Sequence, residues 1–285
     1  MKKIIFMVLA LLLISSANSQ ENKKELNICS FNVRYNSPDD GINIWENRKD
    51  WLTHSMRFYQ ADLMGTQEVT HTQLVDMQAL LPNYAYIGIG REGDTQGEYS
   101  AIFYKKDRFE VVDSNTFWLS ETPNVIASKG WDAALPRIVT WALFKDKHSG
   151  VSFYHFNTHF DHRGKQARIE SAALLTQKIN EIAGGSPVLL TGDFNSSPDS
   201  EAIDTLLKNG LKDPYLNLDS DQVYGPEYSA NGWDAAGRTS DSRIDYVFYK
   251  GAVQPLTLQI LDGQRGQRYI SDHFPVIAKV ELSNN

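Results

Sequence analysis

The sequence of 285 residues contains one cysteine, Cys29, so no disulfide can form within the chain. It has no excess of basic residues either: 28 Lys and Arg stand against 35 Asp and Glu, a net charge of −7. Proteins that hold long nucleic acids usually carry a basic footprint, so this balance favours a small ligand over a polynucleotide. No internal repeat, low-complexity tract or linker interrupts the chain, which predicts a single domain over residues 20–285.

No apolar run is long enough to span a membrane, because the run Ile4–Ile14 falls well short of the about 20 residues that a spanning helix requires. The basic residues Lys2 and Lys3 precede that run, and the small residues Ala17-Asn18-Ser19 follow it. This order is typical of a secretory signal peptide that is cleaved after its last small residue. We therefore expect residues 1–19 to be removed on export to the periplasm or the extracellular space.

Hydrophobic patterning predicts many short strands and a few helices. Helical spacing and cap residues predict four helices, at 46–60, 71–80, 164–183 and 200–208. Runs rich in Val, Ile, Phe and Tyr predict eleven strands, at 26–33, 62–67, 84–90, 99–105, 110–118, 138–145, 151–158, 187–193, 244–249, 255–261 and 274–281. The blocks "FYHFNTHF" and "PVLLTGDF" are typical of central strands covered on both faces. The pattern favours two stacked sheets with helices outside.

Polar residues that bind metals or transfer protons gather at the ends of these strands. Residues two apart in a strand share a face, so Asp193 and Asn195 point together while Phe194 points away. Each polar residue alone could be a turn, cap or core residue. Their common place at strand ends favours one shared site, formed by Asn32, Glu68, Asn157, His159, Asp193, Asn195, Asp245, Asp272 and His273.

The motifs around these residues carry a resemblance to a known family. In chain order they are "SFNVR", "TQEV", "EYSAIFY", "LPRIVTW", "NTHFDH", "TGDFN", "RIDYVF" and "SDHFPV". With this ordered set the chain resembles the endonuclease/exonuclease/phosphatase superfamily over nearly its whole length after residue 19. The resemblance implies an α/β fold, a four-layer sandwich of two mostly antiparallel sheets packed face to face with helices outside. It also implies hydrolysis of a phosphodiester or phosphomonoester by in-line attack of water, without a protein nucleophile.

The resemblance implies a metal and a base. Glu68 matches the principal ligand of a divalent cation, Mg²⁺ with Mn²⁺ as the alternative, and Asn32 and Asp272 match residues that complete or orient that site. Asp193 matches the residue that activates the attacking water, and Asn195 beside it holds the phosphate or a second metal. Oxygen ligands suit Mg²⁺, and a carboxylate can take the proton of the water.

Two histidines are expected to contact the scissile phosphate. His273 matches one of them and Asp245 its carboxylate partner; His159 matches the other, with Glu98 as its partner. A carboxylate beside an imidazole raises its pKa and favours the charged form. We therefore expect both histidines to stabilise negative charge on the phosphoryl oxygens.

A third set of residues is expected to bind the substrate. Arg137 resembles a phosphate-binding arginine of several family branches, and Asn157 shares its strand face with His159. Trp131 and Trp233 lie in the loops "SETPNVIASKGWDAALPR" and "YGPEYSANGWDAAGRTSDSR". Each indole could stack on a sugar or a base, or could instead pin its loop to the body of the protein.

The substrate expected from these observations is a small phosphoester linked to a sugar or a lipid. A secreted endonuclease or exonuclease acting on DNA or RNA is the alternative within enzymes. A non-catalytic binding module with the same fold is the alternative of another class, but no residue of the expected site is missing. Nothing in the sequence indicates an obligate protein partner.

Overall fold

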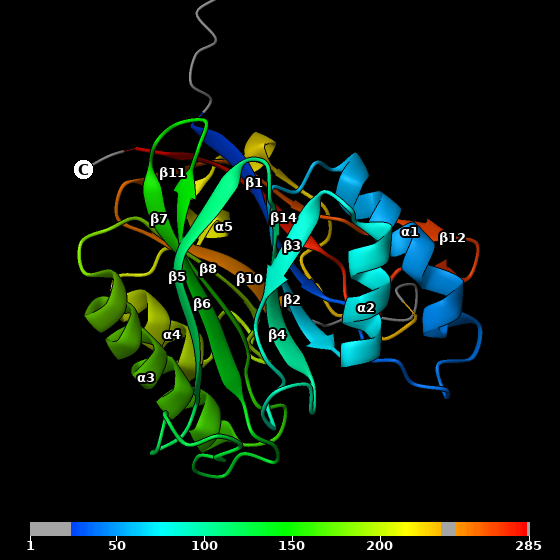
Figure 1. Ribbon diagram of the computed structural model, residues 1–285, viewed down its shortest axis with the longest axis horizontal. Helices are drawn as coiled ribbons and strands as arrows, with labels where there is room; N and C mark the ends of the chain where they lie inside the picture. Colours follow the sequence, from blue (N-terminus) through cyan, green and yellow to red (C-terminus); the bar gives the residue numbers. More distant parts are fainter. Residues whose placement is uncertain (1–23, 235–242, 284–285) are drawn as a thin grey trace, which may run out of the picture.

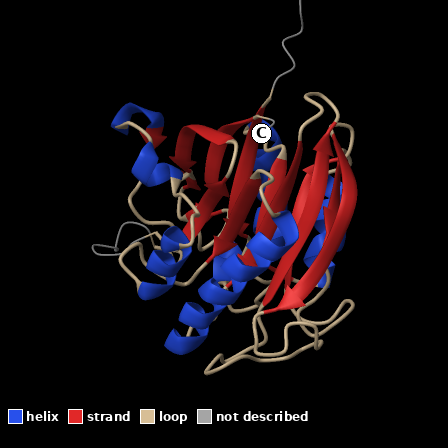
Figure 2. Cartoon of the chain, turned by 90° about the vertical axis from the view of Figure 1, so that its left-hand side faces the viewer, coloured by secondary structure: helices blue, strands red, loops and turns tan. Residues whose placement is uncertain are grey.

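The structure, a computed structural model, describes residues 24–234 and 243–283. The predicted signal peptide, residues 1–19, lies outside the described residues. Two β-sheets pack face to face and helices cover the outer face of each sheet (Figures 1 and 2). The predicted four-layer α/β sandwich is therefore confirmed. Within the described ranges, no helix is long and apolar enough to cross a membrane.

The larger sheet has seven strands in the order β3-β4-β2-β1-β14-β11-β9. Among its described strands, β1–β2 and β9–β11 pair in parallel and the other pairs are antiparallel. Side chains alternate along β1 and contribute to the apolar cores on both faces of the sheet. Leu26 and Ile28 face the other sheet, while Cys29 and Phe31 face the helices. The strands are β1 (Glu25–Asn32), β2 (Leu63–Val69), β3 (Tyr84–Ile87), β4 (Tyr99–Lys105), β9 (Val223–Tyr224), β11 (Val253–Ile260) and β14 (Val276–Leu282).

The smaller sheet has five strands in the order β10-β8-β7-β6-β5, and only β7–β8 is a parallel pair. Along β8, Leu189 faces the other sheet and Leu190 faces the helices. The strands are β5 (Phe109–Trp118), β6 (Ile138–Asp146), β7 (Ser152–His159), β8 (Val188–Asp193) and β10 (Asp245–Lys250). A separate short hairpin joins β12 (Gln264–Arg265) to β13 (Arg268–Tyr269).

The helices bury apolar side chains against the outer sheet faces. Met56 and Met77 pack on the seven-stranded sheet, and Leu175 and Leu206 pack on the five-stranded sheet. The first pair comes from α1 (Trp45–Phe58) and α2 (His71–Leu80), and the second from α3 (Lys165–Ala183) and α4 (Glu201–Lys208). Three single-turn elements complete the described part of the chain: η1 (Gly41–Asn43), α5 (Pro214–Asn217) and η2 (Ser220–Gln222).

Hydrogen bonds between side chain and backbone join the two sheets. The Asn157 side chain in β7 donates to Thr66 O and Ala101 O of the other sheet, at 2.9 and 3.0 Å. A Cβ at Gly65 would lie 1.9 Å from Thr191 Oγ1, so glycine is what lets β2 and β8 approach this closely. These contacts fix how the strand ends of the two sheets meet.

All eleven predicted strands and all four predicted helices are present, with small shifts in their bounds. The predicted strand 84–90 already ends at Ile87, because Gly88 has a φ of +132° and turns the chain. The elements that were not predicted, η1, α5, η2, β9, β12 and β13, have two to four residues each. Such short segments contain too few residues for a periodic pattern.

Candidate active site

A cleft of about 460 Å³ opens where β1, β2, β7 and β8 end. Its volume is in the range typical of small-molecule sites. The residues that line it are Arg34, Tyr35, Glu68, Arg91, Glu98, Leu135, Arg137, His159, His162, Asp193, Asn195, Asp272 and His273. Eight of these were predicted for the site: six from their place at strand ends, and Glu98 and Arg137 from the family resemblance.

Glu68 reaches the cleft because the backbone turns at the end of β2. Its φ is +61°, and the pairing of β2 with β4 shifts in register between Thr66 and Val69. Such a bulge redirects a side chain at a sheet end. The side chain is then held on both oxygens: Asn32 Nδ2 donates to Oε1 at 3.0 Å, and the backbone N–H of Tyr35 donates to Oε2 at 3.2 Å.

The Asn32 side-chain amide bridges the carboxylates of Glu68 and Asp193, and its oxygen is not turned toward them as a cation ligand would be. Its Nδ2 also donates to Asp193 Oδ2 at 2.9 Å, while its Oδ1 accepts from the backbone N–H of Arg34 at 3.0 Å. Of the two predicted roles, completing or orienting the cation site, this geometry fits orienting. Asp272, the other predicted member, lies with its Oδ2 3.7 Å from Arg34 Nη1. Burial raises the pKa of Asp272.

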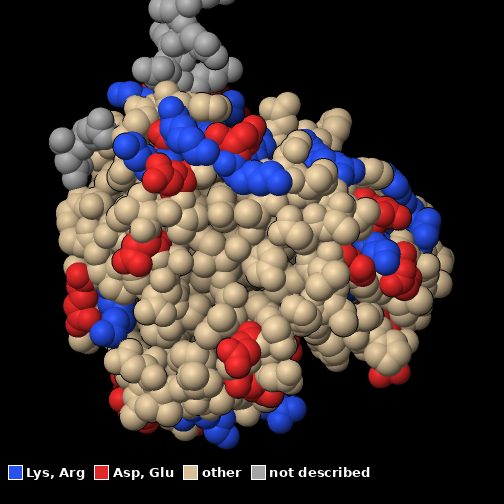
Figure 3. Space-filling model, in the orientation of Figure 1, with Lys and Arg blue, Asp and Glu red and all other residues tan. Residues whose placement is uncertain are grey.

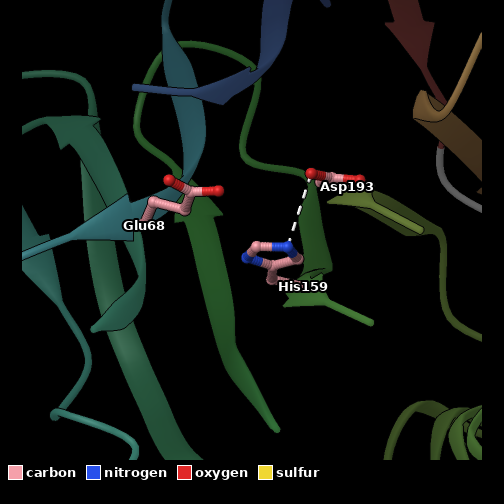
Figure 4. Close-up of side chains that lie close together, drawn as sticks. All are labelled: Glu68, His159 and Asp193. Atoms are coloured by element: carbon pink, nitrogen blue, oxygen red, sulfur yellow. Dashed lines mark ion pairs between the residues drawn. The ribbon is translucent and has the colours of Figure 1, made fainter. Parts of the chain in front are cut away.

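The acidic side chains of the cleft fit a hard divalent cation. Glu68, His159 and Asp193 each offer one ligand atom, and these atoms lie within 4.8 Å of one another (Figure 4). Asp272 adds a further carboxylate to the same cleft. A donor set dominated by carboxylate oxygens suits Mg²⁺ or Mn²⁺ better than a softer metal.

Asp193, the last residue of β8, is a buried carboxylate with fixed geometry. Asn32 holds its Oδ2, and the backbone N–H of Asn195 donates to its Oδ1 at 2.9 Å. Burial, together with the nearby charge of Asp245, raises the pKa of Asp193 to about 7. Phe194 points away as predicted and packs against Phe160 with ring centroids 4.8 Å apart.

His273 has the carboxylate partner that the sequence predicted. Its Nδ1 lies 2.8 Å from Asp245 Oδ2, and Ser229 Oγ donates to the same oxygen at 2.6 Å. Burial disfavours the charge on His273, but Asp245 and then Asp193 outweigh it and raise the pKa of the imidazole well above its usual value. His273 is therefore a cation that faces the cleft.

His159 differs from its prediction. Glu98 does not pair with it, because Glu98 Oε2 lies 2.7 Å from Arg91 Nη1 instead. Burial, followed by the charge of Arg137, lowers the pKa of His159 well below its usual value, so the expected rise is wrong. The uncharged ring has its Nε2 3.0 Å from Asn195 Nδ2, which can donate to it. The same Nε2 lies 3.4 Å from Asp193 Oδ2, so His159 contacts both Asn195 and the carboxylate beside it (Figure 4).

Arg137 lies in the cleft wall, where the sequence placed it. Its Nη2 is 3.0 Å from His162 Nδ1 and its Nε is 3.5 Å from Asp161 Oδ2. Burial, together with the nearby charge of Arg91, lowers the pKa of Arg137. The Asp161 carboxylate also accepts from four backbone N–H groups, those of Ala134, Leu135, Arg163 and Gly164, and so ties two cleft loops together.

Asn157 does not reach the cleft, and its predicted role in substrate binding is wrong. The side chain is fully buried between the sheets. Its Oδ1 accepts from Gln67 Nε2 at 2.7 Å and Thr191 Oγ1 at 3.0 Å, in addition to its two bonds to the other sheet. All its hydrogen-bonding capacity is thus used within the protein.

The two tryptophans do not line the cleft either. Trp233 packs against the core between the sheets, and the Arg48 guanidinium lies 5.6 Å from its ring. Trp131 has a φ of +50°, and its backbone N–H donates to the Glu121 carboxylate. The structure thus favours loop packing for Trp233, and for both residues it contradicts a place in the cleft.

Five cleft residues were not predicted: Arg34, Tyr35, Arg91, Leu135 and His162. Arg34 is the last residue of the motif "SFNVR" that contains Asn32, and Tyr35 directly follows it, so their position in the sequence was a usable signal. Arg91 lies in the loop between β3 and β4, where no periodic pattern indicates which way a side chain points.

Comparisons with known proteins agree with this geometry. A family model described as the "Endonuclease/Exonuclease/phosphatase family" matches residues 29–273. An endonuclease/exonuclease/phosphatase structure from Bacteroides vulgatus is 41% identical with a TM-score of 0.87, over 91% of this chain and 99% of that chain. A mannosyl-6-phosphatase structure from Bacteroides thetaiotaomicron is 38% identical with a TM-score of 0.82, over 90% and 99% of the two chains.

A more distant relative is named for a different activity. The 3′-5′-exoribonuclease subunit of the CCR4-Not complex from Emericella nidulans is 21% identical over 326 residues. The match covers 84% of this chain but 48% of the exoribonuclease subunit. The chain thus spans about half the length of that relative.

Proposed function

The chain belongs to the endonuclease/exonuclease/phosphatase family, and on that premise we propose that it is an exported, Mg²⁺-dependent phosphatase of small phosphoesters, with sugar phosphates as its preferred substrates. Family membership makes it a phosphoesterase, a hydrolase of phosphate esters. The observation that carries the proposal is the meeting of Asp193, Glu68 and His273 at one cleft. We assign the catalytic domain to residues 20–285.

The acidic side of the cleft is proposed to hold the cation. Glu68 and Asp272 would be its carboxylate ligands, and Asn32 would orient Glu68 through its 3.0 Å hydrogen bond. When bound, Mg²⁺ neutralises charge on the phosphoryl group and stabilises the leaving oxygen.

The protein's own groups would then move the proton and stabilise the charge. Asp193 takes the proton of the attacking water, a role that suits a carboxyl group with a pKa of about 7. Asn32 and the Asn195 backbone keep its two oxygens in place during that transfer. His273, held as a cation by Asp245, donates to a non-bridging phosphoryl oxygen.

Two observations support a small sugar phosphate as substrate. The mannosyl-6-phosphatase from Bacteroides thetaiotaomicron matches over 90% of this chain, and the cleft volume of about 460 Å³ suits a ligand of that size. The net charge of −7 disfavours a polynucleotide. On the face in Figure 3, Lys and Arg of the described residues are interspersed with Asp and Glu.

The test is a phosphate-release assay on the mature protein. With Mg²⁺, mannose 6-phosphate is expected to release inorganic phosphate, and EDTA is expected to stop the release. Calorimetry should detect Mg²⁺ binding that is lost in Glu68→Gln, a readout that does not depend on turnover. If a broad panel of phosphoesters yields no metal-dependent hydrolysis while Mg²⁺ still binds, the protein is a binding module rather than an enzyme.

A nuclease is the second candidate, supported by the exoribonuclease relative. Poly(A) and supercoiled plasmid, incubated under the same conditions, separate it from the phosphatase. Faster hydrolysis of either nucleic acid than of mannose 6-phosphate would replace the proposed function.

Export is tested separately, by expressing the full chain in a bacterial host. We expect cleavage after Ser19 and recovery outside the cytoplasm, because residues 1–19 have the layout of a signal peptide. Mass spectrometry of the product locates the new N-terminus. A product that keeps residues 1–19 in the cytoplasm would contradict export and leave the enzymatic proposal intact.

A further inference from the structure

An ion pair in the cleft wall has no part in the mechanism above. Arg91 and Glu98 both line the cleft that contains Asp193 and His273, and Arg91 Nη1 lies 2.7 Å from Glu98 Oε2. Arg91 is 8% exposed, and its buried Nε has no hydrogen-bond partner among the described residues. Within the same ranges, the Glu98 carboxylate accepts a hydrogen bond from Arg91 alone. Within the described residues, the terminal nitrogens of Arg91 and the carboxylate of Glu98 make only this one hydrogen bond, so both groups retain hydrogen-bonding capacity.

The loop between β3 and β4 is built around this pair. The backbone N–H of Arg91 donates to Glu98 O at 3.0 Å, and Trp118 Nε1 donates to Arg91 O at 2.7 Å. Gly97 has a φ of +77°, and a Cβ there would lie 3.0 Å from Arg91 Cγ. The loop therefore positions the guanidinium before any ligand arrives, which reduces the entropy lost on binding.

The chemistry of the pair fits hydroxyl groups better than a second anion. A guanidinium only donates hydrogen bonds and a carboxylate only accepts them, whereas a hydroxyl does both. Two adjacent sugar hydroxyls can therefore bind side by side, one accepting from Arg91 and one donating to Glu98. A second phosphate or carboxylate would be repelled by Glu98. Low exposure strengthens such hydrogen bonds.

We propose that Arg91 and Glu98 bind adjacent hydroxyl groups of a phosphorylated sugar and so select sugar phosphates over other phosphomonoesters. The proposal rests on the phosphatase function proposed above and assigns its specificity. An ester without hydroxyls leaves this partly buried pair without new partners, and sites that hydrogen-bond a substrate hydroxyl discriminate strongly against analogues that lack it.

The first experiment compares two substrates in matched variants. For wild type and Glu98→Gln, kcat/KM is measured with mannose 6-phosphate and with p-nitrophenyl phosphate, which has no hydroxyl group. We expect Glu98→Gln to lower the ratio of the two values by at least about tenfold. Glu92→Gln is the control, because it removes the same charge from an exposed position of the same loop. It should leave the ratio within twofold of wild type.

The second experiment needs only the wild-type protein, so it does not depend on how a variant folds. Mannose 6-phosphate is compared with its analogues deoxygenated singly at C2, C3 and C4. At least two adjacent positions should each cost about tenfold or more in kcat/KM. The subsite is refuted if no analogue loses activity and Glu98→Gln keeps the wild-type ratio. The phosphatase proposal fails in a different way, by wild type hydrolysing neither ester.

Discussion

Two groups of charged residues lie at opposite ends of the same strands and differ in how their charges are paired. The far end holds Arg108 between two carboxylates, with Nη1 3.1 Å from Asp62 and Nη2 3.0 Å from Asp146. Asp146 also accepts from the backbone N–H of His148 and from Ser149 Oγ. Burial disfavours its charge, but Arg108 and then His148 outweigh this and lower its pKa.

The catalytic end brings carboxylates together instead. The pKa of Asp193 is raised to about 7 by burial and by Asp245, and that of Asp272 is raised by burial as well. The backbone is also strained there, with positive φ at Glu68 and Asn195. Carboxylates held close together in a buried place cost stability, and they have a use once a cation and a phosphoryl group bind.

Cavity volume does not distinguish the two ends. A hollow of about 430 Å³ adjoins Asp62 and Arg108, close to the 460 Å³ of the catalytic cleft. What differs is the balance around the buried carboxylates: Arg108 outweighs burial and lowers the pKa of Asp146, whereas burial and Asp245 keep the pKa of Asp193 raised. Satisfied ion pairs indicate structural support, whereas raised carboxylate pKa values indicate a site that needs a ligand.

The largest expected effect is the loss of turnover in Asp193→Asn. The substitution removes the proposed base, so kcat should fall by about 10³-fold. Stability against urea should be equal or higher, because a buried carboxylate with a raised pKa is replaced by a neutral group. The control is Asp199→Asn, the same change at an exposed position six residues later, which should leave kcat within twofold. An unfolded Asp193→Asn would indicate a structural carboxylate instead.

Arg108→Met should have the opposite outcome. Removing the guanidinium leaves Asp62 and Asp146 buried without their shared cation, which should lower the free energy of unfolding by about 3 kcal/mol. Chemical denaturation measures that loss, and kcat/KM for the folded fraction should stay within twofold. If activity fell while stability held, the far end would have a functional role and the comparison would fail.

Asp161 tests whether the pKa of a carboxylate depends on its end of the molecule or on its hydrogen-bond partners, because it lies at the catalytic end but is fully paired. Burial disfavours its charge, but the backbone N–H groups of Gly164, Arg163 and Ala134 outweigh this and lower its pKa to about 2. The folded-state pKa is therefore below the unfolded value of about 3.9. Its contribution to stability is complete above that value and is lost as pH falls toward 2. In Asp161→Asn, the free energy of unfolding should therefore fall less steeply than in wild type as the pH is lowered from 5 to 2. An unchanged slope would show that the carboxylate adds nothing to stability.

The sequence could predict the strands and six of the cleft residues because both depend on local patterns. Asp193 ends an apolar run, and its alternation with Phe194 is fixed by strand geometry. The rule that residues two apart in a strand share a face gave a wrong expectation for Asn157, which it placed in the site. It shares a strand face with His159, but two residues along a strand are about 6.6 Å apart, so His159 reaches the cleft while Asn157 stays between the sheets.

The charge partner of a loop residue could not be predicted in this way. Glu98 was paired with His159 through the family resemblance, but its charge partner Arg91 comes from the same loop. That choice depends on the turn at Gly97 and on a hydrogen bond from Trp118, neither of which leaves a periodic signal in the sequence. Pairing, the property that separates the two ends of the molecule, is thus the property that sequence reasoning recovers least.

The smallest expected effect is at Trp131, which lies outside the cleft. Trp131→Ala should change kcat/KM for mannose 6-phosphate by less than twofold, because its ring lines no part of the cleft. Tyr35 is the matched aromatic inside the cleft, with the Arg34 guanidinium 4.4 Å from its ring. Tyr35→Ala should raise KM by several-fold, since it removes a cleft surface and frees Arg34. Steady-state kinetics on both variants decide the matter: a larger effect at Trp131 than at Tyr35 would mean that the substrate extends beyond the cleft onto the loop before β6.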